Sequence, residues 1–311
     1  MLSPIIQDII VNSSILSLLT LGLTLTYLTT KVPNFAHGSF AVVGIYATLT
    51  VSQVYKFGVY SGLGLGFLLG GLVALAQYFV MLRPLSKRNA SIVTLMVATI
   101  AFDIILIAIY NIYANYLTTA FHIISLEFNL FYLDINILGN PGVVIISPIV
   151  LIGVVAALYT LLTRTKFGIA MRATIENPPL AGTIGINTDQ IYIASWFLAG
   201  GIAGIAGALM PLWYISYPEV GSDVFLIAIF SAAVVGGLYN IWGGLIGGLV
   251  VGITETVVII GLSGYVGSWI IPYQPLVPLI AMMVTLLIAP SGLTGVNYNA
   301  LKKRFRRKQN A

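Results

Sequence analysis

The chain has 311 residues, of which 59% are hydrophobic and only 7% are charged, and its formal net charge is +5. Soluble domains carry about 25% charged residues, so this composition excludes a soluble protein and indicates an integral membrane protein. Several apolar stretches approach the roughly 20 residues that cross a bilayer as a helix. Their polarity does not alternate as it would in barrel strands. The sequence therefore predicts an all-α polytopic membrane protein.

Nine candidate spans follow one another along the chain. They cover residues 7–30, 34–55, 59–82, 91–115, 142–163, 190–213, 222–239, 241–262 and 268–289. The seventh and eighth are short and rich in glycine, and one of them is a candidate re-entrant segment, so about 8–9 membrane-spanning helices are expected. The first span follows no basic segment and precedes no cleavage site, so we expect it to stay in the mature protein.

The basic residues are distributed unevenly between the two sides of this map. With the N-terminus outside, every Lys and Arg except Lys56 falls on the cytoplasmic side. The outer loops instead carry acidic residues, which are Glu127, Asp134, Glu219 and Asp223. Cytoplasmic loops of membrane proteins are rich in Lys and Arg, so the pattern predicts an outer N-terminus and a cytoplasmic C-terminus. The basic tail at residues 301–311 would anchor the chain at the inner membrane surface and contact anionic lipid.

Residue counts and missing motifs exclude several kinds of chemistry. The chain has no cysteine and therefore no disulfide or thiolate site. With two histidines and no H-E-x-x-H motif, neither a metal site nor a catalytic site is expected. The chain lacks G-x-x-x-x-G-K-[ST], so it does not bind ATP through a P-loop. Its basic residues lie at span ends, which excludes a nucleic-acid interface. We therefore expect a non-enzymatic chain.

The stretch at residues 164–190 is the longest polar interruption in the second half, and the topology makes it cytoplasmic. Asn177 is a helix N-cap candidate followed by two prolines, and Gly185 stands where a helix ends. A short helix of about two turns is predicted over residues 179–184. Ala181 leaves part of its surface bare, so another backbone could approach. The stretch is either a docking element for a soluble partner or a connecting loop.

Two carboxylates lie inside spans, Asp103 and Glu255. Ionisable groups in hydrocarbon usually face the protein interior or a wet cavity. At about 100° per residue, Glu255 shares a helix stripe with small residues. Each carboxylate either lines a polar pathway or is a structural group hydrogen-bonded to a hydroxyl or the backbone. The glycines at four-residue spacing predict close helix packing, and they are Gly200, Gly204, Gly244, Gly248 and Gly252.

Polar residues also mark the start of the second span. Asn34 and His37 follow Pro33 and precede Gly38. They lie either on one helical face or at an unwound entry. The pair could bind a polar solute or stabilise a helix break, and the alternative for His37 is an interfacial residue with satisfied hydrogen bonds.

The second predicted span contains Asn34–Gly38 (NFAHG) followed by Gly44–Tyr46 (GIY). These residues resemble the NFAHG…GAY signature of branched-chain amino acid ABC transporter permeases of the LivH type. Ala203–Gly207, Phe230–Leu238 and Ala289–Gly295 resemble later motifs in the same order. In the cytoplasmic loop the matching residues are Gly168, Ala170, Arg172, Ala173, Glu176, Ala181, Gly185, Ile186 and Asn187. Ala289 stands where the family often has Arg, and two consecutive prolines are unusual in its loop.

The resemblance implies a permease domain over residues 1–300 in a prokaryotic cell membrane. It implies a second, homologous permease subunit, two cytoplasmic ATP-binding subunits and an extracytoplasmic amino-acid-binding protein. ATP is then used by the partners, so this chain needs no cofactor. The stretch at residues 164–190 would couple the permease to the ATPases, and Asn177 would cap its short helix.

Three alternative functions stay open at this point, and one of them is a non-transporting scaffold. Urea and short-chain amide permeases carry similar Asn, His and Gly residues. A self-sufficient channel or ion-coupled carrier could use Asp103 and Glu255 as ion sites. Ser39–Tyr46 (SFAVVGIY) and Ser231–Tyr239 (SAAVVGGLY) are alike, which makes an internal repeat a further hypothesis.

Overall fold

A computed structural model of the chain describes residues 2–295. The predicted basic tail at residues 301–311 lies outside the described residues. Two short strands, β1 (Asn136–Ile137) and β2 (Asn140–Pro141), form an antiparallel pair in the loop after the fourth predicted span. The α-helices are α1 (Pro4–Thr30), α2 (His37–Leu49), α3 (Gly62–Gln77), α4 (Arg83–Lys87), α5 (Ile92–Phe121), α6 (Gly142–Arg164), α7 (Lys166–Glu176), α8 (Pro178–Thr183), α9 (Thr188–Leu209), α10 (Leu226–Gly236), α11 (Ile241–Val266) and α12 (Leu276–Ile288).

Three π-helical segments and several 3-10 turns extend or join these helices. The π-helical segment Thr50–Val54 lengthens α2, Tyr78–Leu82 joins α3 to α4, and η6 (Gly221–Phe225) leads into α10. The 3-10 segments are Val59–Ser61, Phe131–Leu133, Met210–Leu212, Ser268–Tyr273 and Leu293–Gly295.

Seven helices in the described part of the chain are long and apolar enough to cross a membrane. They are Pro4–Thr30, Val59–Lys87, Ile92–Phe121, Gly142–Arg164, Thr188–Leu212, Ile241–Val266 and Leu276–Gly295. The predicted spans 34–55 and 222–239 form shorter helices, α2 with its extension and η6–α10. The all-α polytopic class is therefore confirmed, and the nine predicted spans each correspond to a helix.

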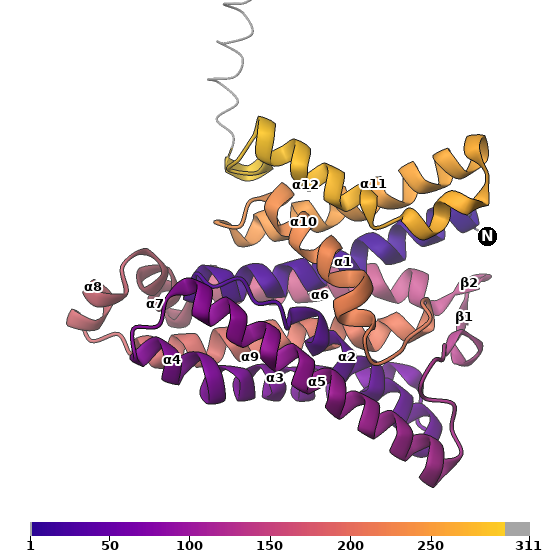
Figure 1. The fold of residues 1–311 in the computed structure, drawn as a ribbon, viewed down its shortest axis with the longest axis horizontal. Helices are drawn as coiled ribbons and strands as arrows, with labels where there is room; N and C mark the ends of the chain where they lie inside the picture. The colour runs from indigo at the N-terminus through magenta and orange to yellow at the C-terminus, as the bar shows by residue number, and fades with distance from the viewer. Residues whose placement is uncertain (1, 296–311) are drawn as a thin grey trace, which may run out of the picture.

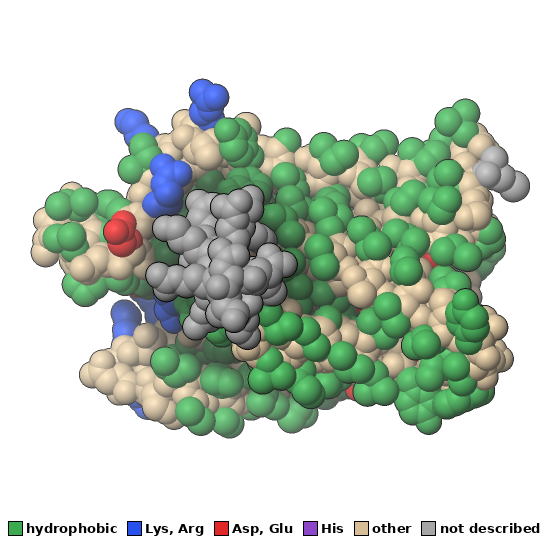
Figure 2. Space-filling view, turned by 90° about the horizontal axis from the view of Figure 1, so that it is seen from above, with side chains coloured by type: hydrophobic (Ala, Val, Ile, Leu, Met, Phe, Trp, Pro, Cys, Tyr) green, Lys and Arg blue, Asp and Glu red, His purple; other side chains and the backbone are tan. Residues whose placement is uncertain are grey.

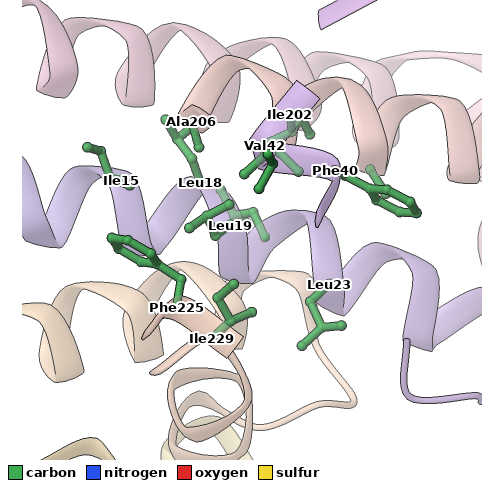
Figure 3. Close-up of a cluster of buried hydrophobic side chains, with 14 of the residues drawn as sticks. Ile15, Leu18, Leu19, Leu23, Phe40, Val42, Ile202, Ala206, Phe225 and Ile229 are labelled. Atoms are coloured by element: carbon green, nitrogen blue, oxygen red, sulfur yellow. The ribbon is translucent and has the colours of Figure 1, made fainter. Parts of the chain in front are cut away.

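Helix α1 runs through the interior of the bundle and packs against α6, α9, α10 and α11. Within an apolar 18-residue stretch of α1, 89% of the residues are buried, compared with 28% in such a stretch of α5. Figure 3 shows that side chains from α1, α2, α9 and η6–α10 meet around its middle. The labelled residues are Ile15, Leu18, Leu19, Leu23, Phe40, Val42, Ile202, Ala206, Phe225 and Ile229. The packing core therefore surrounds the point at which α2 and η6 begin.

Two glycine seams, one between α9 and α3 and one between α11 and α1, bring helices close together, because small residues let helix backbones approach. Cβ atoms on Gly200 and Gly204 of α9 would overlap the backbone of α3. The predicted packing glycines of α11 face hydroxyl-bearing residues of α1 in the same way, and they are Gly244, Gly248 and Gly252. The buried hydroxyls of α1 donate to carbonyls one turn earlier, for example Thr20 to Leu16 at 2.7 Å. Ser17 differs from the others, because its hydroxyl donates across the seam to the carbonyl of Leu245 in α11 at 3.4 Å.

The two ends of the bundle differ in charge. Helices α4, α7 and α8 lie at one end, and the N-terminus lies with the strand pair at the other (Figure 1). On the face seen in Figure 2, Lys and Arg side chains gather at the α8 end. The sequence predicts that this basic end is cytoplasmic, and the orientation stays a prediction.

The two stretches that are alike in sequence have different local structures. Ser39–Tyr46 lies wholly within α2, whereas 231–239 crosses the end of α10 at Gly237, whose φ is +106°. An internal repeat stays a prediction.

Candidate functional site

Helix α2 begins inside the bundle, after an irregular segment over residues 31–36. Pro33 lacks an N–H group and disfavours helical backbone in the residue before it. The Asn34 side chain then accepts a hydrogen bond from the backbone N–H of Ala36 at 3.2 Å. The backbone N–H of Phe35 donates to Thr99 Oγ1 of α5 at 3.1 Å. Of the two predicted arrangements for Asn34 and His37, the structure has the unwound entry.

The starts of α2 and η6 meet backbone to backbone. A Cβ atom on Gly38 would overlap the carbonyl group of Gly221, and one on Gly221 would overlap that of Gly38. Helix α2 and the η6–α10 helix both begin at this contact and lead to opposite ends of the bundle (Figure 1). The contact therefore joins the two short spans inside the protein. We call this contact the helix-start junction, defined by Gly38, Ser39, Gly221 and Ser222.

One carboxylate binds both sides of the helix-start junction. Ser39 Oγ donates to Asp103 Oδ1 at 2.5 Å, and Ser222 Oγ donates to Asp103 Oδ2 at 2.8 Å. The two serine oxygens are 3.5 Å apart. On the same face of α5, the Tyr110 hydroxyl donates to the backbone carbonyl of Ser39 at 2.9 Å.

The charge of Asp103 lies almost out of contact with solvent, since the residue is only 7% exposed. Within residues 2–295 the side-chain ion pair joins Arg83 and Asp189, and Asp103 has no Lys or Arg partner there. Its partners are two hydroxyls, and the positive ends of two helix dipoles lie beside it. This geometry matches the hydrogen-bonded carboxylate that the sequence allowed, and a place on a polar pathway stays a prediction.

Next to the junction, Asn34 and His37 take different partners. His37 Nε2 donates to the carbonyl of Leu19 at 2.9 Å, which leaves Nδ1 as the unprotonated ring nitrogen. Gln77 Nε2 donates to Asn34 Oδ1 at 2.9 Å. Asn34 Nδ2, Gln77 Oε1 and His37 Nδ1 are buried without a hydrogen-bond partner. The Phe35 ring stacks on the ring of Phe230 in α10, with 5.0 Å between the ring centroids. An aromatic contact therefore also joins the two short spans.

Glu255 lies elsewhere, on the face of α11 that packs against α1. Asn12 Nδ2 is 3.5 Å from Glu255 Oε2, and the Tyr214 hydroxyl donates to Asn12 Oδ1 at 3.1 Å. Glu255 borders a cavity of about 240 Å³ whose walls are mostly apolar. The lining residues are Asn12, Leu16, Tyr214, Val224, Phe225, Ala228, Glu255, Ile271, Pro272, Gln274 and Pro275. The two predicted carboxylates therefore belong to separate sites, although η6–α10 contributes to both.

The polar stretch at the α8 end has the predicted caps. Asn177 Oδ1 accepts a hydrogen bond from the backbone N–H of Leu180 at 3.1 Å, and α8 runs from Pro178 to Thr183. Gly185 has φ +87°, a conformation that glycine adopts without strain. Helix α7 ends at Glu176, so the break before the prolines divides the stretch into two helices.

Within this stretch, the structure separates inward-facing from outward-facing side chains. Arg172 Nη1 donates to the carbonyl of Leu162 at 2.7 Å, which ties α7 to the end of α6. Ala181 is only 2% exposed, so it packs inside the chain and does not offer a bare surface. Leu180 and Ile184 are 59% and 70% exposed. Ala173 is half-buried and Glu176 is exposed.

Sequence reasoning missed Ser39, Ser222, Asn12 and Tyr214. Serine and tyrosine are common in membrane helices and carry no pattern that singles them out. Asn12 is an amide inside the first predicted span, and that position is a signal that could have been used.

This bundle of long apolar helices, with polar groups buried where two short spans begin, defines a multi-pass membrane permease. The family model described as "Branched-chain amino acid transport system / permease component" matches residues 5–286, and the chain belongs to this family.

Two curated relatives extend over most of the chain. A probable branched-chain amino acid transport permease protein LivH from Methanocaldococcus jannaschii is 43% identical over 299 residues, covering 96% of this chain and 94% of that protein. The high-affinity branched-chain amino acid transport system permease protein LivH of Escherichia coli is 28% identical, covering 90% of this chain and 91% of that protein. Among solved structures, PsaBC from Streptococcus pneumoniae in complex with Fab matches with a TM-score of 0.51 and 14% identity, over 93% of each chain. At that identity, the likeness concerns the fold alone.

Proposed function

We propose that this chain is one transmembrane subunit of an ATP-driven importer for branched-chain amino acids in a prokaryotic cell membrane. It forms part of the translocation pathway with a second, homologous permease subunit. Two cytoplasmic ATP-binding subunits supply the free energy, and an extracytoplasmic binding protein delivers the amino acid. This chain then binds no cofactor, since ATP is used by its partners.

The observation that carries the coupling role is the shape of the α7–α8 segment. It ends the bundle on the side where Lys and Arg gather (Figures 1 and 2). Its short helix is capped at both ends and presents Leu180 and Ile184 outward. Contiguous exposed apolar patches outside the membrane spans are typical of protein–protein contacts. The surface formed by Leu180 and Ile184 therefore supports docking of an ATPase subunit.

Arg172 links the α7–α8 segment to the membrane-spanning helices. Its bond to the Leu162 carbonyl links α7 to α6, and α6 packs against the central helix α1. Movement of a docked ATPase would then reach the bundle interior as movement of helices rather than of a loose loop. The residues proposed for coupling are Arg172, Ala173, Glu176, Asn177, Ala181 and Gly185.

The solute assignment rests on the two LivH relatives, which are named as branched-chain amino acid permeases. The test is uptake of labelled leucine by cells that express the whole transporter, with excess isoleucine, valine, urea or acetamide as competitors. We expect the amino acids to compete and the amides to have no effect. Competition by urea or acetamide alone would favour the amide-permease alternative.

A further inference from the structure

We infer that Asp103, with Ser39 and Ser222, forms a latch that holds the two short spans together and must open during transport. The inference deepens the proposed function, on which it rests. It assigns Asp103 as a positioning residue of the transport cycle.

The three side chains come from three separate parts of the chain. Asp103 lies on α5, Ser39 in the first turn of α2 and Ser222 in η6. Each oxygen of the carboxylate accepts from one serine, at 2.5 and 2.8 Å. The same carboxylate thus binds both helix starts, and removing either serine bond leaves the other short span attached to α5.

The surroundings of the latch allow the two helix starts to separate. Gly38 and Gly221 meet backbone to backbone without a side chain between them, and the Phe35–Phe230 ring stack would part along with them. Each short span follows an irregular segment, residues 31–36 before α2 and residues 213–220 before η6. Such segments absorb large backbone changes and act as hinges in domain movements.

The two short spans run from the helix-start junction toward opposite sides of the membrane, which is why we expect the junction to change during transport. Both begin at the junction, and their far ends lie at opposite ends of the bundle (Figure 1). Alternating access opens a central path to one side at a time. A contact between one span leading outward and one leading inward is therefore suited to change between the two states. A purely structural carboxylate would keep the same contacts in both.

The latch can be tested by cysteine cross-linking, because the chain has no cysteine of its own. In S39C/S222C the new sulfur atoms replace oxygens that are 3.5 Å apart. A matched control is T118C/S125C, which replaces two oxygens 2.7 Å apart at the outer end of α5. Both variants are prepared in the complete transporter with its ATPase subunits, oxidised, and assayed before and after reduction.

We expect oxidation to abolish leucine uptake by S39C/S222C and reduction to restore it, while T118C/S125C transports equally in both conditions. Full uptake by cross-linked S39C/S222C would overturn the inference, and so would failure of its cysteines to cross-link in any nucleotide state.

A second readout does not depend on the solute. The cross-linking rate of S39C/S222C is compared between nucleotide-free transporter and transporter trapped with ATP and vanadate. We expect at least about a fivefold difference, because the ligand shifts the population between the two states. Equal rates would show a static contact. If wild-type transporter fails to import leucine but this difference is present, the solute assignment fails and the latch stands.

Discussion

Gly38 and Gly221 meet so closely that a Cβ atom on either would overlap the other's backbone carbonyl. The contact joins the starts of α2 and η6, and both helices also bind Asp103 through the serine that follows each glycine. The interior of the protein is therefore organised around two helix beginnings rather than around uninterrupted spans.

This contact predicts that added bulk will destabilise the fold. Gly38→Ala should lower the free energy of unfolding by about 1–3 kcal/mol, the usual cost of overpacking a tight site. Gly153→Ala is the matched control, because a Cβ atom there meets no atom within 4 Å. Thermal unfolding of the two variants in detergent measures the difference. Equal melting temperatures would mean that the helix starts are not in contact.

The outward-facing side chains of α8 predict a partner-binding defect. Leu180→Ser should reduce ATP-driven uptake by at least about tenfold, which corresponds to losing roughly 1.4 kcal/mol of ATPase docking. Co-purification of the ATPase subunits should fall in parallel. Leu138→Ser is the control, since Leu138 is 88% exposed in the turn between β1 and β2. Normal uptake and co-purification by Leu180→Ser would remove α8 from the docking surface.

The turn that ends α8 predicts a separate coupling defect. Proline cannot adopt the φ of +87° found at Gly185, so Gly185→Pro should disrupt the turn and uncouple uptake from ATP hydrolysis. Gly182→Ala serves for comparison, because the space around its Cβ position is open. ATPase stimulation by loaded binding protein is the measurement. The proposed role would be contradicted if Gly185→Pro kept wild-type stimulation at normal expression.

At Glu255 we predict that a substitution leaves uptake intact. Glu255→Gln keeps the size of the side chain and its ability to accept from Asn12, so uptake should persist with a stability loss of about 1 kcal/mol or less. Uptake kinetics and thermal unfolding are measured on the same preparation. Complete loss of uptake at normal expression would instead put the 240 Å³ cavity beside Glu255 on the solute pathway.

Much of the fold could be predicted because its signals are local. Long apolar runs indicated α5, α6 and α11, and glycines at four-residue spacing indicated the seams on α9 and α11. The caps of α8 could be predicted for the same reason, since Asn177, the prolines and Gly185 act on neighbouring residues only.

The helix-start junction could not be predicted, because it depends on contacts between distant parts of the chain. Residues 34–55 are as apolar as a full span, and only Pro33 indicated that the helix begins late. Ser39 and Ser222 are 183 residues apart in sequence, and nothing in either segment specifies the other. The burial of Ala181 could not be predicted either, because a methyl group suits an exposed or a packed position equally well.

The central claim is that this chain serves an importer powered by ATP-binding partners. Its most direct test is leucine uptake into proteoliposomes that contain both permease subunits, the ATPase subunits and the binding protein. Uptake should require ATP on the ATPase side and binding protein on the other, and a proton gradient alone should have no effect. Uptake driven by a proton gradient without ATP would contradict the account and favour an ion-coupled carrier.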